Sequence, residues 1–513
     1  MPDKINNKIN TNNSFSLIGF LAGLVAFFIV LIFGHLGEGH PQTTYTLAIA
    51  LLMAIWWITE TIPLAITSLI PVVLFPLLGI MDGKDISSTY FNHVIFLFIG
   101  GFLIALAMER WNLHKRLALR ILMFTGVSPG RILLGFMIST AFLSMWISNT
   151  ATTMMMIPIL ISIIIQLENT VGKKNLSRYS IGLLLGVAYS ASIGGIATLV
   201  GTPPNLSFSR IFSIFFPDAP EISFAVWFFY AFPVCVVFFI IVWVYLYFVF
   251  RPAKGVWNNA KNLGLREKYL ELGRAKYEEK IVFIIFVLMA LFLLFRSDII
   301  IGNFSIPGWS YIFPDPSFIN DGTVAIFFAV ILFVIPSRTS GTKKIMNWST
   351  ASKIPWNIVL LFGGGFALAS GFKESGLSLW FGEQLKWVIN YHPIIIIAFI
   401  ALFMTFLTEL TSNTATTEMI LPILAGLSIN TEINPLLFML PATLSGSMAF
   451  MLPVATPPNA IVFGTNRLHI KDMAKNGIIL NIIGVIIITL STYFLGMYIF
   501  DIDLSAFPEW AKP

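Results

Sequence analysis

The stretch that decides the fold is SNTATTMMMIP at residues 148–158, which returns as SNTATTEMILP at residues 412–422. Each copy opens with hydroxyl and amide side chains and runs directly into apolar ones. Both copies lie inside long apolar segments, at about 130–165 and about 393–425. Polar groups in the middle of such segments predict that the helix breaks there and that its tip faces a polar space.

The composition is that of a membrane protein. Of 513 residues, 57% are hydrophobic and 11% are charged, and the mean hydropathy is +0.85, whereas soluble domains are about half apolar and about a quarter charged. Apolar stretches long enough to cross about 30 Å of hydrocarbon recur, for example at 17–33, 224–250, 281–295 and 478–500. The polar N-terminus lacks a small-residue cleavage site, so we expect the first span to be retained. The single cysteine, Cys235, argues against disulfides and cysteine metal sites.

The charged loops predict an orientation. Loops 109–131 and 338–353 are basic, and 251–280 carries eight Lys and Arg against four Glu, so all three are expected in the cytoplasm. Much of the loop 251–280, from residue 254 onward, is predicted to form an amphipathic surface helix near anionic lipid. Loops 214–222 and 297–321 are acidic and are expected outside. The net charge of +6 is therefore assigned to cytoplasmic loops and not to nucleic-acid binding.

Threading the spans between these loops predicts about eleven crossings of the cell membrane, with the N-terminus cytoplasmic and the C-terminus extracellular. The two segments that carry the repeated phrase are not among these crossings, and each must begin and end on the same side of the membrane. We therefore expect two re-entrant helical hairpins with polar tips midway across the membrane. Pro158 and Pro422 are expected to interrupt or redirect a helix just past each tip.

A second element is repeated in the same order. SIGGIATLVGTPPN at residues 192–205 follows the first phrase, and SGSMAFMLPVATPPN at residues 445–459 follows the second. Their paired prolines predict that a helix unwinds there. Upstream, NHVIFLFIGGFLIALAME from Asn92 matches PWNIVLLFGGGFALASGFKE from Pro355. The charge count places the two hairpins on opposite sides, and inverted repeats with broken helices indicate a secondary transporter with a midplane site.

The residue types indicate what this site binds. Ser, Asn and Thr supply neutral hydrogen-bond donors, and helix N-termini add positive dipole ends, a combination that suits carboxylate oxygens. Two tips related by an approximate two-fold axis favour a dicarboxylate. Neither phrase contains Lys or Arg, so a cation such as Na⁺, held by backbone carbonyls and Ser and Asn oxygens, is expected to compensate the charge. The alternative is an exchanger, in which the helix dipoles alone compensate the charge of the substrate.

The paired phrases FLSMWISNTATT (from Phe142) and FLTELTSNTATT (from Phe406), with the two Pro-Pro loops, resemble the divalent anion:sodium symporter (DASS) family, which includes INDY-type citrate and succinate carriers. The resemblance runs from about residue 45 to the C-terminus. It implies an all-α, elevator-type transporter that forms a homodimer, with a scaffold domain and a moving transport domain in each protomer.

The resemblance also implies roles for individual residues. One Na⁺ site would use Ser144, Ser148, Asn149 and the Gly201 carbonyl, and its counterpart would use Thr408, Ser412, Asn413 and the Ala455 carbonyl. The residues expected to contact or line the site of the substrate are Ser148, Asn149, Thr150, Thr202, Pro203, Ser412, Asn413, Thr414, Thr456 and Pro457.

Glu418 departs from the symporters of this family, which often carry a small or hydroxyl residue at this position. The family also contains exchangers that swap malate, succinate and 2-oxoglutarate without a sodium gradient. Symport and exchange therefore both stay open, as do citrate as a substrate and the role of Glu418.

Other functions are less compatible with the sequence. A channel or a carrier of another anion such as sulfate would use similar broken helices. No metalloprotease, nucleophile-elbow or ATP-binding motif is present, so the chain is not expected to be an enzyme or to need a cofactor besides Na⁺. Glu60 and Glu409, inside spans, are expected to make internal hydrogen bonds or buried pairs.

The sequence predicts a division into six regions: a cytoplasmic tail (1–14), scaffold with first-repeat helices (15–129), a first transport region (130–250), a cytoplasmic loop (251–280), scaffold with second-repeat helices (281–392) and a second transport region (393–513).

Overall fold

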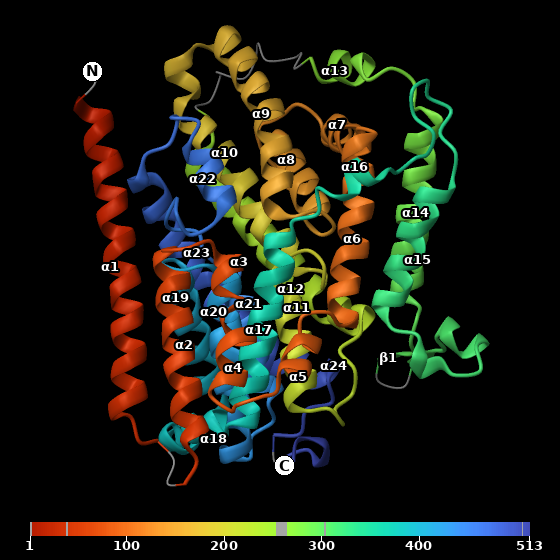
Figure 1. Ribbon diagram of the computed structural model, residues 1–513. Helices are drawn as coiled ribbons and strands as arrows, with labels where there is room; N and C mark the ends of the chain where they lie inside the picture. The colour runs from red at the N-terminus through yellow and green to blue at the C-terminus, as the bar shows by residue number, and fades with distance from the viewer. Residues whose placement is uncertain (1–2, 37–38, 253–263, 302–303, 505, 513) are drawn as a thin grey trace.

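The computed structural model describes the chain except residues 1–2, 37–38, 253–263, 302–303, 505 and 513. Most of the described chain is helical (Figure 1). One small antiparallel hairpin, β1 (Ile299–Ile301) and β2 (Phe304–Ile306), lies in the loop expected outside. The all-α expectation therefore holds apart from this hairpin.

The first half of the chain contains the helices of the first repeat. They are α1 (Asp3–Phe33), α2 (Pro41–Thr59), α3 (Leu64–Thr67), α4 (Ile70–Leu77), α5 (Gly83–Ser88), α6 (His93–Arg110), α7 (Leu113–Thr125), α8 (Pro129–Ser144), α9 (Asn149–Val171), α10 (Lys173–Ile196), α11 (Pro203–Phe215) and α12 (Phe224–Phe250).

The second half repeats much of this order after a connecting helix. Its helices are α13 (Leu265–Glu271), α14 (Tyr277–Leu294), α15 (Asp321–Val334), α16 (Trp348–Ala351), α17 (Trp356–Glu374), α18 (Leu377–Gln384), α19 (Pro393–Thr408), α20 (Asn413–Thr431), α21 (Leu436–Ser445), α22 (Pro457–Phe463), α23 (Ile470–Leu490) and α24 (Met497–Ile499), with one π-helical turn, Ser491–Gly496, before α24. The predicted amphipathic helix from residue 254 falls partly outside the described residues.

Both repeated phrases form a helix, a polar break and a second helix. The breaks join α8 to α9 and α19 to α20, and the partners in each pair are in contact. The expectation that Pro158 and Pro422 interrupt a helix is wrong, because α9 and α20 run through them. A proline within a helix removes one hydrogen bond, a loss that surrounding helices can accommodate in a membrane protein. The chain breaks instead at the Ser-Asn-Thr tips.

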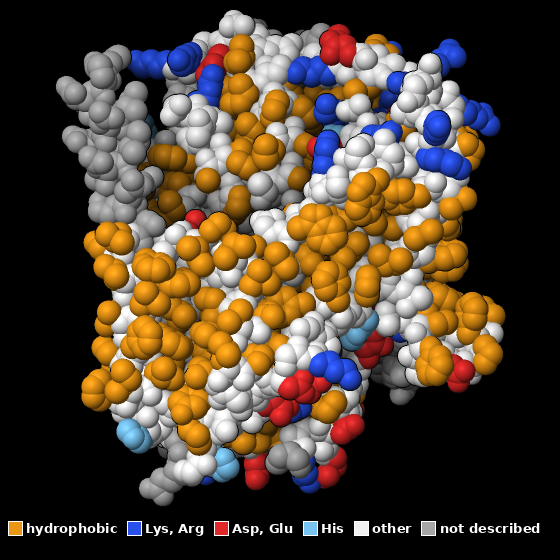
Figure 2. All heavy atoms as spheres, viewed as in Figure 1, with side chains coloured by type: hydrophobic (Ala, Val, Ile, Leu, Met, Phe, Trp, Pro, Cys, Tyr) orange, Lys and Arg blue, Asp and Glu red, His pale blue; other side chains and the backbone are white. Residues whose placement is uncertain are grey.

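The surface agrees with a multi-pass membrane protein. Hydrophobic side chains cover a broad band of the face shown in Figure 2, Lys and Arg gather at its upper end, and Asp and Glu gather at its lower end. Among the described residues, six helices are long and apolar enough to cross a membrane, and six shorter apolar helices accompany them. The C-terminus lies at the acidic lower end (Figures 1 and 2).

Two matching helices, α6 and α17, pack against the broken segments. A cap begins α6, because the Asn92 side chain accepts hydrogen bonds from the backbone N–H groups of Val94 (3.0 Å) and Ile95 (3.3 Å). In packing, α6 contacts α15 and α11, whereas α17 contacts α20 and α11. The repeated helices thus bring the broken segments of both halves together.

Candidate functional site

The first tip is an oxygen-rich cluster at the N-terminus of α9. The Ser144 hydroxyl faces two acceptors, the backbone carbonyl oxygen of Ala191 at 2.7 Å and Oδ1 of Asn149 at 2.5 Å. A hydroxyl carries a single hydrogen, so it satisfies one acceptor at a time. Ser148 begins the helix, because its Oγ accepts from the Ala151 N–H at 3.3 Å.

The first unwound loop lies against this tip. A Cβ placed on Gly195 would lie 2.6 Å from Asn149 Oδ1 and 3.2 Å from the carbonyl oxygen of Gly201, so both oxygens lie close to that glycine. The side-chain amide of Asn205 holds the loop by donating to the carbonyls of Gly195 (3.2 Å) and Thr198 (2.7 Å). The structure therefore brings the predicted cation ligands Ser144, Asn149 and Gly201 together.

The second tip repeats this arrangement. The Thr408 hydroxyl lies 2.6 Å from Asn413 Oδ1 and 3.0 Å from the carbonyl oxygen of Gly446. Again one hydroxyl hydrogen serves two acceptors. Thr408 and Asn413 occupy the positions of Ser144 and Asn149 in the other repeat, so the geometry is duplicated along with the phrase.

The second unwound loop is held by the matching asparagine. The Asn459 side chain donates to the carbonyls of Ala449 at 3.0 Å and Leu452 at 3.1 Å, as Asn205 does in the first repeat. The Thr456 hydroxyl accepts from the Asn459 N–H at 3.3 Å and caps α22. Both asparagines stand in the repeated motif, but nothing in that motif indicates that their amides close the loop.

A carboxylate completes the second loop. Glu409 is buried and accepts hydrogen bonds from the backbone N–H groups of Phe450 (2.7 Å), Met451 (2.8 Å) and Leu452 (3.1 Å), and from the Asn481 amide (2.8 Å). The prediction of internal hydrogen bonds is confirmed for Glu409, whereas the expectation of a buried Glu60 inside a span is wrong, because Glu60 follows the end of α2 and is exposed.

The remaining predicted residues lie at or beside the starts of the four helices that follow the breaks. Thr150 is half-buried and Thr414 is buried, whereas Pro457 is exposed. These residues are Thr150 in α9, Ser412 and Thr414 at α20, Thr202 and Pro203 at α11, and Ala455, Thr456 and Pro457 at α22.

The two repeats cross over at these helices. The helix after the first tip, α9, packs against α22 of the second repeat, while α20 packs against α11 of the first. All four motifs thereby form one connected cluster. Thr150 lies in α9 and Thr414 lies in α20, so they stand on helices of the two different crossing contacts.

Glu418 lies in the second crossing contact. It is fully buried, and its Oε1 accepts a hydrogen bond from the Ser207 hydroxyl of α11 at 2.9 Å. The sequence singled out Glu418 as unusual without assigning it a partner, and Ser207 was not predicted.

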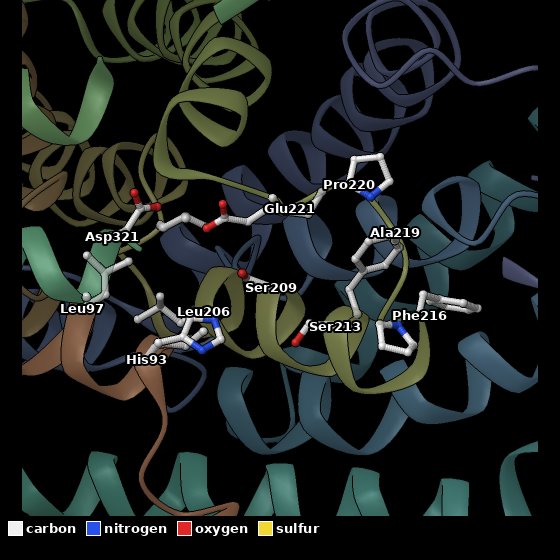
Figure 3. A pocket seen from close by; sticks show the side chains of 16 residues that line it. His93, Leu97, Leu206, Ser209, Ser213, Phe216, Ala219, Pro220, Glu221 and Asp321 are labelled. Carbon is white, nitrogen blue, oxygen red and sulfur yellow. The ribbon is translucent and has the colours of Figure 1, made fainter. Parts of the chain in front are cut away.

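A cavity of about 190 Å³ lies apart from the predicted tip residues, between α6, α11 and the segment before α12 (Figure 3). Glu221 and Asp321 line one end of it, and Arg296 pairs with both, at 2.7 Å and 2.5 Å. Burial disfavours the guanidinium cation, but the attraction of the two carboxylates outweighs it and raises the pKa of Arg296. Arg296, Glu221 and Asp321 thus join three segments of the chain, and both carboxylates are paired with the guanidinium.

Comparison with known proteins gives a consistent result. Residues 12–501 match the family described as the sodium:sulfate symporter transmembrane region. The chain is 43% identical over 507 residues to the sodium-dependent dicarboxylate transporter SdcS of Staphylococcus saprophyticus, covering 98% of this chain and 95% of the relative. It is 45% identical over 496 residues to SdcS of Staphylococcus aureus strain MSSA476, covering 95% and 93%.

Among solved structures, the YdaH transporter of Alcanivorax borkumensis is similar, with a TM-score of 0.56 at 12% identity, over 88% of this chain and 98% of that one. At this identity the likeness concerns the fold alone.

Proposed function

This chain belongs to the sodium:sulfate symporter family, and on that premise we propose that it carries C4 and C5 dicarboxylates such as succinate, malate and 2-oxoglutarate across a membrane, coupled to Na⁺. The membership agrees with the resemblance found in the sequence and with a transporter that is not an enzyme. The names of the SdcS relatives favour a dicarboxylate over sulfate.

The substrate is proposed to bind between the two tips. Asn149 and Thr150 begin α9, and Asn413 and Thr414 begin α20. The first N–H groups of each helix lack intrahelical partners and carry the positive end of the helix dipole, so each tip suits one carboxylate. Thr202, Pro203, Thr456 and Pro457, which start the two Pro-Pro helices, complete the walls.

Sodium is proposed to bind beside each tip. At each tip, neutral oxygens lie close together with too few hydroxyl hydrogens to donate to all of them. These oxygens belong to Ser144, Asn149 and the Gly201 carbonyl at one tip, and to Thr408, Asn413 and the Gly446 carbonyl at the other. A hard monovalent cation relieves the repulsion between such oxygens, and it offsets the charge of the substrate within the membrane. Ser148, Ser412 and the Ala455 carbonyl stay assigned to these sites by the family resemblance.

Alternating access is proposed to follow from the inverted repeats. One crossing contact, α11 with α20, is covered by α17, whereas side chains beside the other, α9 with α22, are exposed. If the α9 and α22 contact became covered and the α11 and α20 contact became exposed, the site would open to the opposite side of the membrane. We assign the movement to the transport regions, 130–250 and 393–513, sliding against the scaffold in an elevator-like shift within a homodimer.

The orientation is likewise a proposal. Lys and Arg gather at the upper end in Figure 2, which the positive-inside rule places in the cytoplasm of the cell. The C-terminus at the acidic lower end would then be extracellular, after about eleven crossings and two re-entrant hairpins. The unequal cover of the two crossing contacts would make this conformation open towards the cytoplasm.

The observation that carries the proposal is the duplicated cluster, Ser144 with Asn149 and Thr408 with Asn413. The test is uptake of labelled succinate into proteoliposomes. We expect the rate to rise steeply with external Na⁺, and Asn149→Ala or Asn413→Ala to reduce it by about 100-fold or more while the protein remains folded. Normal uptake by both variants would remove the assignment.

The same proteoliposomes separate the coupling modes. Uptake that needs Na⁺ and proceeds into empty vesicles indicates symport. Equal uptake in K⁺, accelerated by dicarboxylate inside, would establish exchange and overturn the sodium sites. Competition by unlabelled citrate and sulfate defines the anions that the site accepts.

A further inference from the structure

The proposed transport chemistry leaves one ionisable group in the crossing contacts without a role. Glu418 lies one helical turn beyond Thr414 on α20 and is fully buried. Its Oε1 accepts from Ser207 at 2.9 Å, but its Oε2 has no hydrogen-bond partner among the described residues. A buried carboxylate oxygen without a partner is costly, whereas a protonated carboxyl carries no charge to compensate.

The scaffold covers this carboxyl directly. A Cβ placed on Gly365 of α17 would collide with the carboxyl carbon of Glu418, so the acid is pressed against the backbone of that helix. Contact this close leaves no room for water between them. The carboxyl therefore sits at the surface between α20, which we assign to the transport domain, and α17, which we assign to the scaffold.

The charged and titratable groups on the neighbouring elements do not neutralise Glu418. Tyr90 is close enough to interact with it electrostatically, but its hydroxyl donates to the Ser68 carbonyl at 2.5 Å. The side chain of Arg210 on α11 reaches Ser213, and Lys373 of α17 binds the carbonyl of Ile214. The other such groups on elements packed against α20 are Tyr45, Glu374, Glu383 and Lys386, and the last two pair with each other.

The other repeat indicates what happens to this position in the opposite conformation. Met154 occupies in α9 the place that Glu418 occupies in α20, and it is 60% exposed. If the two crossing contacts exchange their cover, as the proposed alternating access requires, Glu418 becomes uncovered as Met154 is here. An acid that is open in one conformation and sealed in the other responds to protons in only one of them.

We propose that Glu418 is a proton-binding site that gates the movement. On the side where α20 is uncovered, the carboxylate takes a proton from water and forms an O–H bond. The neutral acid can then slide under Gly365, and the ionised form cannot because its charge would be buried without a partner. When α20 is uncovered again the proton returns to the same side, so no net proton crosses the membrane. This inference rests on the proposed function.

The first test measures uptake while the pH of one compartment changes at a time. Fumarate is the probe, because it remains a dianion over the range from about pH 6 to about pH 9. In the wild type we expect the rate to fall by up to about tenfold per pH unit above a midpoint, as for one required proton. The fall should follow the pH on the side where α20 opens, extracellular in our assignment. A vesicle-entrapped pH dye should report no net proton flux.

Glu418→Gln keeps the shape of the neutral acid and cannot ionise. We expect it to transport at the low-pH rate of the wild type throughout, with less than about twofold variation. Met154→Gln is the matched control from the other repeat and should keep the wild-type profile. A wild-type pH profile in Glu418→Gln, or a change in its Na⁺ dependence in place of its pH dependence, would overturn the proposal.

Two further measurements keep the outcome decisive. If Glu418→Gln does not fold, Ser207→Ala retains the acid but removes the donor that favours its ionised form, so the midpoint should move to higher pH. An unmoved midpoint would count against the gate. Infrared spectra of the purified protein should show the C=O band of a protonated acid that Glu418→Gln loses. That band needs no transport, so its presence with failed dicarboxylate uptake would refute the proposed function and leave the proton site standing.

Discussion

The two crossing contacts are built from the same sequence elements but differ in two facing positions and in how far they are exposed. In α11 with α20, Glu418 is fully buried and bonded to Ser207. In α9 with α22, the corresponding positions carry Met154, which is 60% exposed, and Ile461. One contact is polar and sealed, and the other is apolar and open.

The two unwound loops likewise differ in how far their side chains are exposed. Val200 lies 7% exposed beneath α6, where a Cβ placed on Gly101 would be 3.5 Å from its Cγ1. Val454, its counterpart, is 83% exposed. Symmetry in the sequence therefore produces a duplicated cluster of oxygens, while the surrounding helices cover its two halves unequally.

The buried acidic residues also distinguish the second repeat from the first. Glu409 and Glu418 both belong to the second repeat, and methionines, Met145 and Met154, hold their places in the first. The repeats share the groups that would bind ligands and the asparagines that hold the loops, and they differ in the acids that brace the second loop and the α11 and α20 contact. Under the proposed mechanism, the binding groups are duplicated and the acid that gates the movement is not.

The largest expected effect comes from removing Glu409. Glu409→Ala leaves three backbone N–H groups at residues 450–452, one buried and two partly buried, without their acceptor, each costing up to about 1–3 kcal/mol. We expect uptake to fall by about 100-fold or more, because the loop that forms the second site loses its geometry. Met145→Ala is the control and should retain far more uptake, with about 2–5 kcal/mol of lost packing stability. Thermal unfolding and uptake measured together check this, and equal losses of uptake would contradict the division.

The next effect concerns access. With Cys235 replaced by Ser, a cysteine at Val454 should react with a polar thiol reagent about tenfold faster than one at Val200, because only the former is uncovered. We expect the difference in permeabilised vesicles at rest. Equal rates would mean that the two arrangements are equally populated in solution, and a condition that reverses the rates would identify the opposite conformation.

Much of this molecule could be predicted from its sequence because the decisive elements occur twice. The tips and the unwound loops follow from repeated residues whose chemistry is local, and the grouping of Ser144 with Asn149 and of Thr408 with Asn413 follows from the family resemblance. The loop-closing amides of Asn205 and Asn459 act on carbonyls several residues away, in a loop conformation that no pattern specifies. The Glu418 and Ser207 pair joins positions 211 residues apart, and only the crossing of the repeats brings them together.

A smaller effect is expected from two matched glycines. Gly365→Ala places a methyl group against the carboxyl carbon of Glu418, closer than the two groups can approach, so the buried carboxyl must shift or α17 and α20 must separate, at a cost of about 1–3 kcal/mol to the covered conformation. Gly101→Ala places one 3.5 Å from Val200, which is ordinary contact, and should change stability by less than about 0.5 kcal/mol. Unfolding midpoints of the two variants measure the difference. Equal costs would show that α17 does not press on α20.

The smallest effect is expected at Met154. Because its side chain is 60% exposed and covers little, Met154→Ala should alter the free energy of unfolding by less than about 0.5 kcal/mol. The matched change at the other repeat, Glu418→Ala, opens a buried space and leaves the Ser207 hydroxyl without its acceptor, so it should cost about 2–4 kcal/mol. Chemical denaturation in the same detergent compares the two. A cost at Met154 as large as at Glu418 would mean that the α9 and α22 contact is also covered in solution, and the inequality of the two contacts would then no longer describe the resting protein.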